Sequence, residues 1–137
     1  MKKNLIFIIV VALFIIVVII GGIISVVVFK GKVNIKTEDA LLRYSHHGIT
    51  IEQPLSKEES QLIKSIFNSK KTYIDNPSCG FSAGISVSFD DKIFCIACDR
   101  CPTIKYLNSN KYFKISEEQR NEIEKIFNKY GGTFPCV

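Results

Sequence analysis

Histidine is nearly absent from this sequence, and residues 49–137 contain none. The two that occur, His46 and His47, precede that region. A Ser-His or Cys-His catalytic pair within residues 49–137 is therefore excluded. The sequence also lacks a glycine-rich phosphate loop, a Walker sequence and an H-E-x-x-H motif. We predict that the protein is not an enzyme and holds no cofactor.

One long segment, Leu5–Phe29, contains no charged residue and no proline. This run exceeds the roughly 20 helical residues that cross a hydrocarbon core of about 30 Å. It is also longer than the apolar region of roughly 7–15 residues in a cleaved signal peptide, and no A-x-A site follows it. We predict an uncleaved signal anchor, with a cytoplasmic leader at residues 1–4 and a transmembrane helix at residues 5–29.

Basic residues lie on both sides of this predicted span. Lys2 and Lys3 precede it, and Lys30, Lys32 and Lys36 follow it, so the positive-inside rule discriminates little. We predict a cytoplasmic N-terminus because exported chains begin with a short basic leader followed directly by an apolar run. The prevalence of lysine, isoleucine and asparagine, whose codons are AT-rich, indicates a bacterial protein.

The formal net charge of +5 is concentrated near the predicted span. Residues 1–48 contain six basic and two acidic residues, whereas residues 49–137 contain twelve and eleven. A nucleic-acid interface requires a basic face on the folded domain, so we expect no nucleic acid among the partners. Basic residues beside a span suit anionic lipid headgroups, and the lipid bilayer is an expected partner.

Residues 30–48 show no sustained hydrophobic period, and we interpret them as a juxtamembrane stalk. His46 and His47 would belong to this stalk. Adjacent side chains point apart in most regular structure, and no cysteine or carboxylate stands near them in the sequence. We therefore predict no metal site.

Residues 49–137 are predicted to form an α+β domain of order β-α-β-β-β-β-α. Ser56–Glu59 and Ser116–Gln119 match the capping box that marks a helix start, and apolar residues at helical spacing follow each. Alternating or continuous apolar runs predict strands at Ile49–Glu52, Ile85–Phe89, Lys92–Cys98, Thr103–Leu107 and Lys111–Ile115. We expect an antiparallel sheet with both helices on one face.

All five cysteines lie in this domain, three of them in the stretch 93-IFCIACDRCP-102. A small domain buries limited apolar surface, and a disulfide that closes a loop of some tens of residues contributes about 3–4 kcal/mol. The disulfide candidates are Cys79, Cys98, Cys101 and Cys136, and we expect Cys136 to pair with Cys101 or Cys98. Cys95 is the candidate for an unpaired, buried thiol.

Three other interpretations of the cysteines stay open. An iron–sulfur cluster would need a fourth nearby ligand, and a strand would direct Cys95 and Cys98 to opposite faces. Structural zinc would need four convergent thiolates from Cys79, Cys98, Cys101 and Cys136, but a second C-x2-C pair is missing. A redox-active pair at Cys98 and Cys101 would have no helix N-terminus to lower its pKa.

The preferred hypothesis is a single-pass membrane protein that displays a small binding or interaction module outside the cytoplasm. We expect its partner to be another membrane protein, an envelope component or a peptide. One alternative is a membrane-tethered thiol–disulfide oxidoreductase that uses Cys98 and Cys101. The other is a zinc-binding module that faces the cytosol.

Overall fold

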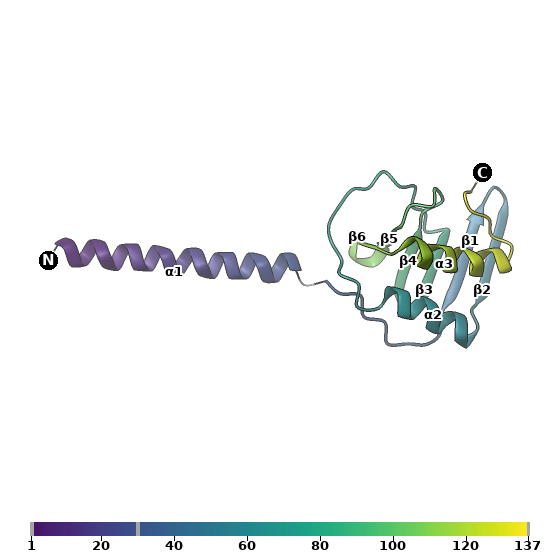
Figure 1. Ribbon diagram of the computed structural model, residues 1–137, viewed down its shortest axis with the longest axis horizontal. Helices are drawn as coiled ribbons and strands as arrows, with labels where there is room; N and C mark the ends of the chain where they lie inside the picture. Colours follow the sequence, from purple (N-terminus) through teal and green to yellow (C-terminus); the bar gives the residue numbers. More distant parts are fainter. Residues whose placement is uncertain (1, 30, 137) are drawn as a thin grey trace. The chain divides into compact units, whose positions relative to one another are not determined.

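The computed structural model describes residues 2–29 and 31–136, and in the first helix the side chains of residues 9–22 (Figure 1). The chain forms two compact units, Met1–Gly31 and Lys32–Val137. The elements in chain order are α1 (Lys2–Phe29), β1 (Leu41–His46), β2 (Ile49–Pro54), α2 (Lys57–Phe67), β3 (Ile85–Phe89), β4 (Lys92–Ile96), β5 (Thr103–Tyr106), the short 3₁₀ helix η1 (Leu107–Ser109), β6 (Lys111–Lys114) and α3 (Glu117–Lys129).

Helix α1 makes up most of the first unit, and the helix predicted over residues 5–29 is present within it. Its described large apolar side chains are all exposed, from 40% at Val11 to 70% at Phe14. Among the residues that the structure describes, no helix combines the length and the hydropathy of a bilayer-crossing segment. Met1 of the predicted leader and Lys30 of the predicted stalk lie outside the described residues.

The second unit is built on a six-stranded antiparallel sheet with the strand order β2-β1-β3-β4-β5-β6. Tight turns connect β1 to β2 and β3 to β4, and at the first turn His47 and Gly48 have φ angles of 46° and 78°. Positive φ at both central residues is typical of the type I′ turn, which suits the twist of a two-residue hairpin. The connection from β2 to β3 contains α2 and returns the chain beside β1. The predicted α+β class, with an antiparallel sheet and two helices, is therefore confirmed.

The predicted stalk over residues 30–48 is corrected by the structure, because β1 lies inside the sheet between β2 and β3. Leu42 and Tyr44 of β1 are fully buried, and Val33 and Ile35 upstream of it are buried as well. These side chains belong to the main hydrophobic core. The observed order in the second unit is therefore β-β-α-β-β-β-β-α, one strand more than predicted.

Helices α2 and α3 pack against the same face of the sheet (Figure 1). The strand register places Tyr44, Phe94 and Phe113 on one face, since partners across a ladder share a side. The ring of Phe67 in α2 lies 5.0 Å from that of Phe94 and 5.3 Å from that of Phe113. The ring of Phe127 in α3 lies 6.4 Å from that of Tyr44. The core therefore fills the space between this face and the two helices.

The helices begin at the two predicted capping boxes. The Ser56 hydroxyl accepts a hydrogen bond from the Glu59 backbone N–H at 3.2 Å, and Ser116 and Gln119 repeat this arrangement. Glu59 also accepts hydrogen bonds from Lys129 and Tyr130 at the end of α3, both at 2.7 Å. Burial raises the pKa of Glu59, but these hydrogen bonds outweigh it and lower the pKa to about 2. The N-terminal end of α2 is thereby joined to the C-terminal end of α3.

The burial of β1 leads to a stability prediction. Leu42→Ala should lower the free energy of unfolding by about 2–5 kcal/mol, because it opens a cavity in the core. Leu62→Ala is the matched control, since Leu62 in α2 is 38% exposed, and it should change the free energy by less than about 1 kcal/mol. Urea denaturation of the full chain in detergent measures both. Equal effects of the two substitutions would contradict the burial of β1 in the hydrophobic core.

Candidate functional site

Two disulfides converge on the loop between β4 and β5. Cys98 is bonded to Cys136, with Cα atoms 5.1 Å apart, and Cys101 is bonded to Cys79, with Cα atoms 6.1 Å apart. The prediction that the domain contains disulfide bonds is thereby confirmed. Cys98 and Cys101 are not bonded to each other. Each of them instead links this C-x-x-C sequence to a different distant segment of the chain.

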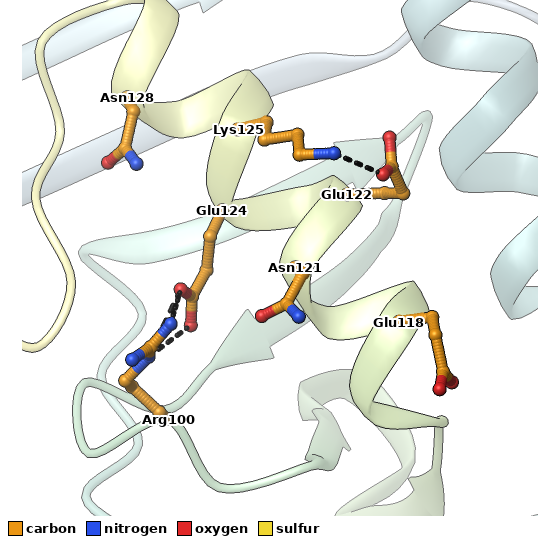
Figure 2. Close-up of a pocket in the computed structure, with 7 residues that line it drawn as sticks. All are labelled: Arg100, Glu118, Asn121, Glu122, Glu124, Lys125 and Asn128. Atoms are coloured by element: carbon orange, nitrogen blue, oxygen red, sulfur yellow. Dashed lines mark hydrogen bonds and ion pairs between the residues drawn. The ribbon is translucent and has the colours of Figure 1, made fainter.

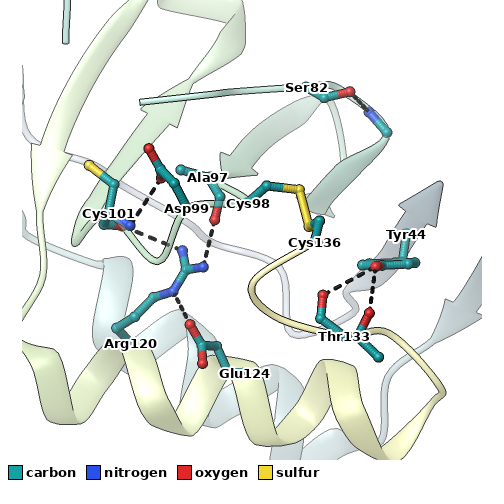
Figure 3. The surroundings of a disulfide bond; sticks show 11 residues. Tyr44, Ser82, Ala97, Cys98, Asp99, Cys101, Arg120, Glu124, Thr133 and Cys136 are labelled. Carbon is teal, nitrogen blue, oxygen red and sulfur yellow. Dashed lines mark hydrogen bonds and ion pairs between the residues drawn. A yellow bond between two sulfur atoms is a disulfide. The ribbon is translucent and has the colours of Figure 1, made fainter. Parts of the chain in front are cut away.

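The sheet topology explains why these segments meet. Strands β1 and β4 are each antiparallel to β3, so they run parallel to each other and end at the same edge of the sheet. His46 is the last residue of β1, and Cys98 follows the end of β4. The segment after α3 returns to this edge, where the disulfide joins Cys136 to Cys98 (Figure 3). The Cys136 backbone N–H also donates to the Cys98 carbonyl oxygen at 3.3 Å.

The free cysteine, Cys95, lies in β4 on the sheet face opposite the helices. It is 1% exposed, and the register aligns it with Ser86 of β3 and Lys105 of β5. Burial raises the pKa of the Cys95 thiol, and the positive charge of Lys105 opposes this only in part. A buried thiol with a raised pKa is a poor nucleophile. Cys95 therefore acts as a packing residue.

An ion cluster built on the buried pair Arg120 and Glu124 attaches α3 to the β4–β5 loop (Figure 3). Arg120 is 2% exposed, and its guanidinium donates to Glu124 at 2.8 Å and to the Ala97 carbonyl oxygen at 2.6 Å. Arg100 reaches the same carboxylate from the loop at 3.0 Å. Burial raises the pKa of Glu124, but hydrogen bonds from Arg100 and Arg120 outweigh it and lower the pKa. The loop is therefore held through its carbonyl groups and through Arg100.

Sequence reasoning did not identify this cluster. Arg120 and Glu124 occupy the same helical phase as Ile123 and Phe127, the buried apolar face of α3. Charged residues four positions apart on an apolar helix face are a readable signal for a buried ion pair. The third member, Arg100, could not be linked to α3 from sequence alone, because the loop and the helix are joined only in the tertiary structure.

The outer surface of α3 beside Arg100 forms a hollow of about 530 Å³ (Figure 2). Every residue that lines it is polar or charged: Arg100, Glu118, Asn121, Glu122, Glu124, Lys125 and Asn128. Lys125 and Glu122 form an ion pair at 2.6 Å. Pockets for small molecules are mostly apolar and enclose their ligand, so this polar hollow is better suited to hydrogen bonding with a polar chain.

A second hollow of about 140 Å³ lies on the sheet face opposite the helices. Its lining comes from β1, β3, β4 and the turn between β3 and β4: Leu41, Arg43, Ser86, Ser88, Asp90, Asp91 and Ile93. Arg43 is already paired with Glu52 at 3.0 Å. The smaller volume leaves the α3 hollow as the stronger candidate for binding.

Two groups of side chains have metal-ligand chemistry in the described part of the chain. His46, Cys98 and Cys136 form one, and Cys79, Asp99 and Cys101 form the other. In both groups the two sulfur atoms are joined in a disulfide. They are therefore not thiolates, the form in which cysteine binds metals. The zinc alternative from the sequence, with all four thiolates, does not describe the oxidised domain.

The disulfides lead to a prediction about stability. The sequence separation is 38 for Cys98–Cys136 and 22 for Cys79–Cys101, so the chain-entropy model assigns them about 4 and about 3 kcal/mol. Replacing Cys98 and Cys136 together by serine should lower the free energy of unfolding at least as much as replacing Cys79 and Cys101. Urea denaturation of both double variants tests this. A Cys98/Cys136 double variant as stable as the wild type would contradict the tethering role.

Comparison with protein-family models, with curated proteins and with solved structures finds no match to this chain. Its function is therefore inferred from its own residues and their geometry.

Proposed function

We propose that this protein is a membrane-anchored binding module whose second unit, Lys32–Val137, faces an extracytoplasmic compartment. The pair of disulfides carries this proposal. Disulfides persist in oxidising compartments and are rare in the cytosol, where thiols are kept reduced. The two bridges therefore indicate an oxidising, extracytoplasmic setting for the domain.

Helix α1 is the proposed anchor. It has 28 residues, which corresponds to about 42 Å at a rise of 1.5 Å per residue. Its described side chains expose apolar surface in every direction around the helix axis, as in Ile9, Phe14 and Ile15. A soluble surface helix would instead combine an apolar stripe with a polar face. A helix that is apolar all round suits lipid, and this is the reason for proposing α1 as the membrane anchor.

The hollow on α3 is the proposed binding surface. Asn121 and Asn128 offer amide groups that both donate and accept hydrogen bonds, and Lys125 and Glu122 add one charge of each sign. This combination suits the backbone of an extended peptide or of a loop of another envelope protein. The lining contains no histidine, cysteine or serine, which favours binding over nucleophilic catalysis.

The rigidity beneath the hollow supports this role. Arg120 and Glu124 hold the β4–β5 loop against α3, and the two disulfides fix the same loop to two other segments. A surface that is already ordered loses little conformational entropy when it binds. The hollow is therefore preorganised for a partner, although its side chains lie at the surface.

Anchoring and orientation can be tested together in bacterial cells that express the full chain with a C-terminal epitope tag. We expect the protein to stay in the membrane pellet after an alkaline carbonate wash and to be released by detergent. We expect protease added to intact spheroplasts to remove the tag.

The matched variant carries Ile15→Lys and Ile16→Lys, each of which costs about 3 kcal/mol at the centre of a bilayer, and it should appear in the wash. Release of the wild type by carbonate would exclude an anchor. A tag that resists protease until the cells are lysed would place the domain in the cytoplasm.

The binding surface can be tested with peptides selected from a display library on the full chain in detergent. Asn121→Arg fills the hollow with a bulky charged side chain and should weaken binding at least about tenfold, equivalent to 1.4 kcal/mol. Asn76→Arg is the matched control, because Asn76 is an exposed asparagine in the loop before β3, and it should leave the affinity unchanged. Equal affinities for the two variants would remove the hollow from the proposal.

A further inference from the structure

Three potential metal ligands from distant segments of the chain lie together at one edge of the sheet. They are His46 at the end of β1, Cys98 in the β4–β5 loop and Cys136 near the end of the chain. One imidazole nitrogen and the two sulfur atoms all lie within 4.8 Å of one another. This group is not evident in the sequence, because its members are up to 90 positions apart and meet only in the folded domain, where β1 and β4 run parallel.

His46 supplies a second, independent observation. Its Nε2 atom is inaccessible to solvent and has no hydrogen-bond partner among the described residues. A buried polar atom without a partner costs about 1–3 kcal/mol, and such atoms in a native structure need an explanation. The nearest ring is that of His47, with centroids 4.1 Å apart. The His46 ring therefore carries a buried nitrogen without a hydrogen-bond partner, and one of its two nitrogens lies within 4.8 Å of the two sulfur atoms. Neutral imidazole is a common metal ligand through either nitrogen.

We propose that reduction of the Cys98–Cys136 disulfide converts this group into a zinc site formed by two thiolates and the His46 imidazole. Zinc is bound by cysteine sulfur and histidine nitrogen, and sites with three protein ligands keep a fourth position for water. The group contains no carboxylate, so it does not suit magnesium or calcium, which prefer oxygen ligands.

The movements needed to form the site are small. In a tetrahedral zinc site, bonds of about 2.0–2.3 Å place neighbouring ligand atoms about 3.4–3.8 Å apart. The imidazole nitrogen and the sulfurs are already within 4.8 Å, and the two sulfurs separate once their bond is broken. Shifts of roughly 1–2 Å therefore suffice.

The chemical balance is simple. A dithiol reductant transfers two electrons and two protons to the Cys98–Cys136 bond, which becomes two thiols, and the reductant becomes a disulfide. Zn²⁺ then forms two Zn–S bonds and displaces the two thiol protons. The imidazole binds in its neutral form and adds the third bond. The two negative charges of the thiolates therefore balance the two positive charges of Zn²⁺.

The surrounding structure holds the three segments after the bridge opens. Tyr44 donates from its hydroxyl to the Thr133 carbonyl oxygen at 3.1 Å, which holds the segment before Cys136. Arg120 holds the loop at Ala97. Both Cys98 and Cys136 are partly exposed, so a reductant and the ion can reach them. The site is therefore accessible and retains its framework.

The other group, Cys79, Asp99 and Cys101, is a weaker candidate. The Asp99 carboxylate accepts a hydrogen bond from the Cys101 backbone N–H at 3.2 Å, and Asp99 is exposed. This group has no buried atom that lacks a partner among the described residues. Replacing Cys79 and Cys101 by serine removes this second group. The proposed site of His46, Cys98 and Cys136 is left intact.

The test uses the full chain with Cys79→Ser and Cys101→Ser, in detergent and without oxygen. The protein is reduced with a dithiol, which is then removed, and Zn²⁺ alone is added and counted by elemental analysis after gel filtration. Co²⁺ in a parallel sample reports thiolate bonding through its sulfur charge-transfer absorption. We expect one zinc per reduced chain and none in the oxidised chain.

His46→Asn and His47→Asn form a matched pair in this background. We expect His46→Asn to weaken zinc binding at least about tenfold and His47→Asn to leave it unchanged. Thermal melting of the same samples covers the case in which reduction unfolds the domain, because zinc should raise the melting temperature of the reduced protein but not of His46→Asn. The proposal would be wrong if the His46→Asn and His47→Asn variants bound zinc equally well. It would also be wrong if the oxidised protein bound zinc, or if the reduced parent bound none.

Discussion

The bond between Cys98 and Cys136 is the constraint on which the geometry at this end of the sheet depends. It fixes the segment after α3 to the β4–β5 loop. Ordering the backbone of each residue in that segment costs about 1–2 kcal/mol, and the bridge reduces this cost because it already restricts the segment in the unfolded chain. With it, Phe134 is held in ring contact with Tyr44 and Phe127, at centroid distances of 6.1 and 5.4 Å. The tether thereby closes one end of the hydrophobic core.

The ion cluster around Arg120 has a complementary role. A buried charge is costly unless it is paired and its donors are satisfied, and Arg120 meets both conditions through Glu124 and the carbonyl oxygens of the loop. Its guanidinium also lies 4.8 Å from the ring centroid of Phe134. One side chain therefore contacts α3, the loop and the C-terminal segment. This arrangement couples the outer surface of α3 to the disulfide edge of the sheet.

The difference between the predicted and observed strand number has a clear cause. β1 has only two core-facing residues with strong hydrophobic character, Leu42 and Tyr44, and it is flanked by polar residues. An alternation this short is not distinguishable from a polar connection by periodicity alone. Its burial comes from pairing with β2 and β3 on both sides, and β3 begins about forty residues further along the chain. Predicting β1 would have required knowledge of that pairing.

Local chemistry in the sequence was sufficient for the apolar helix, the two capped helices and the hairpin strands after Ile85, because each of these depends on residues within a few positions of one another. The division of the cysteines between the two bridges, the insertion of β1, and the meeting of His46 with Cys98 and Cys136 were decided by tertiary structure alone. These features depend on which distant segments reach the same edge of the sheet. That choice follows from strand order and packing, and no short stretch of sequence encodes it.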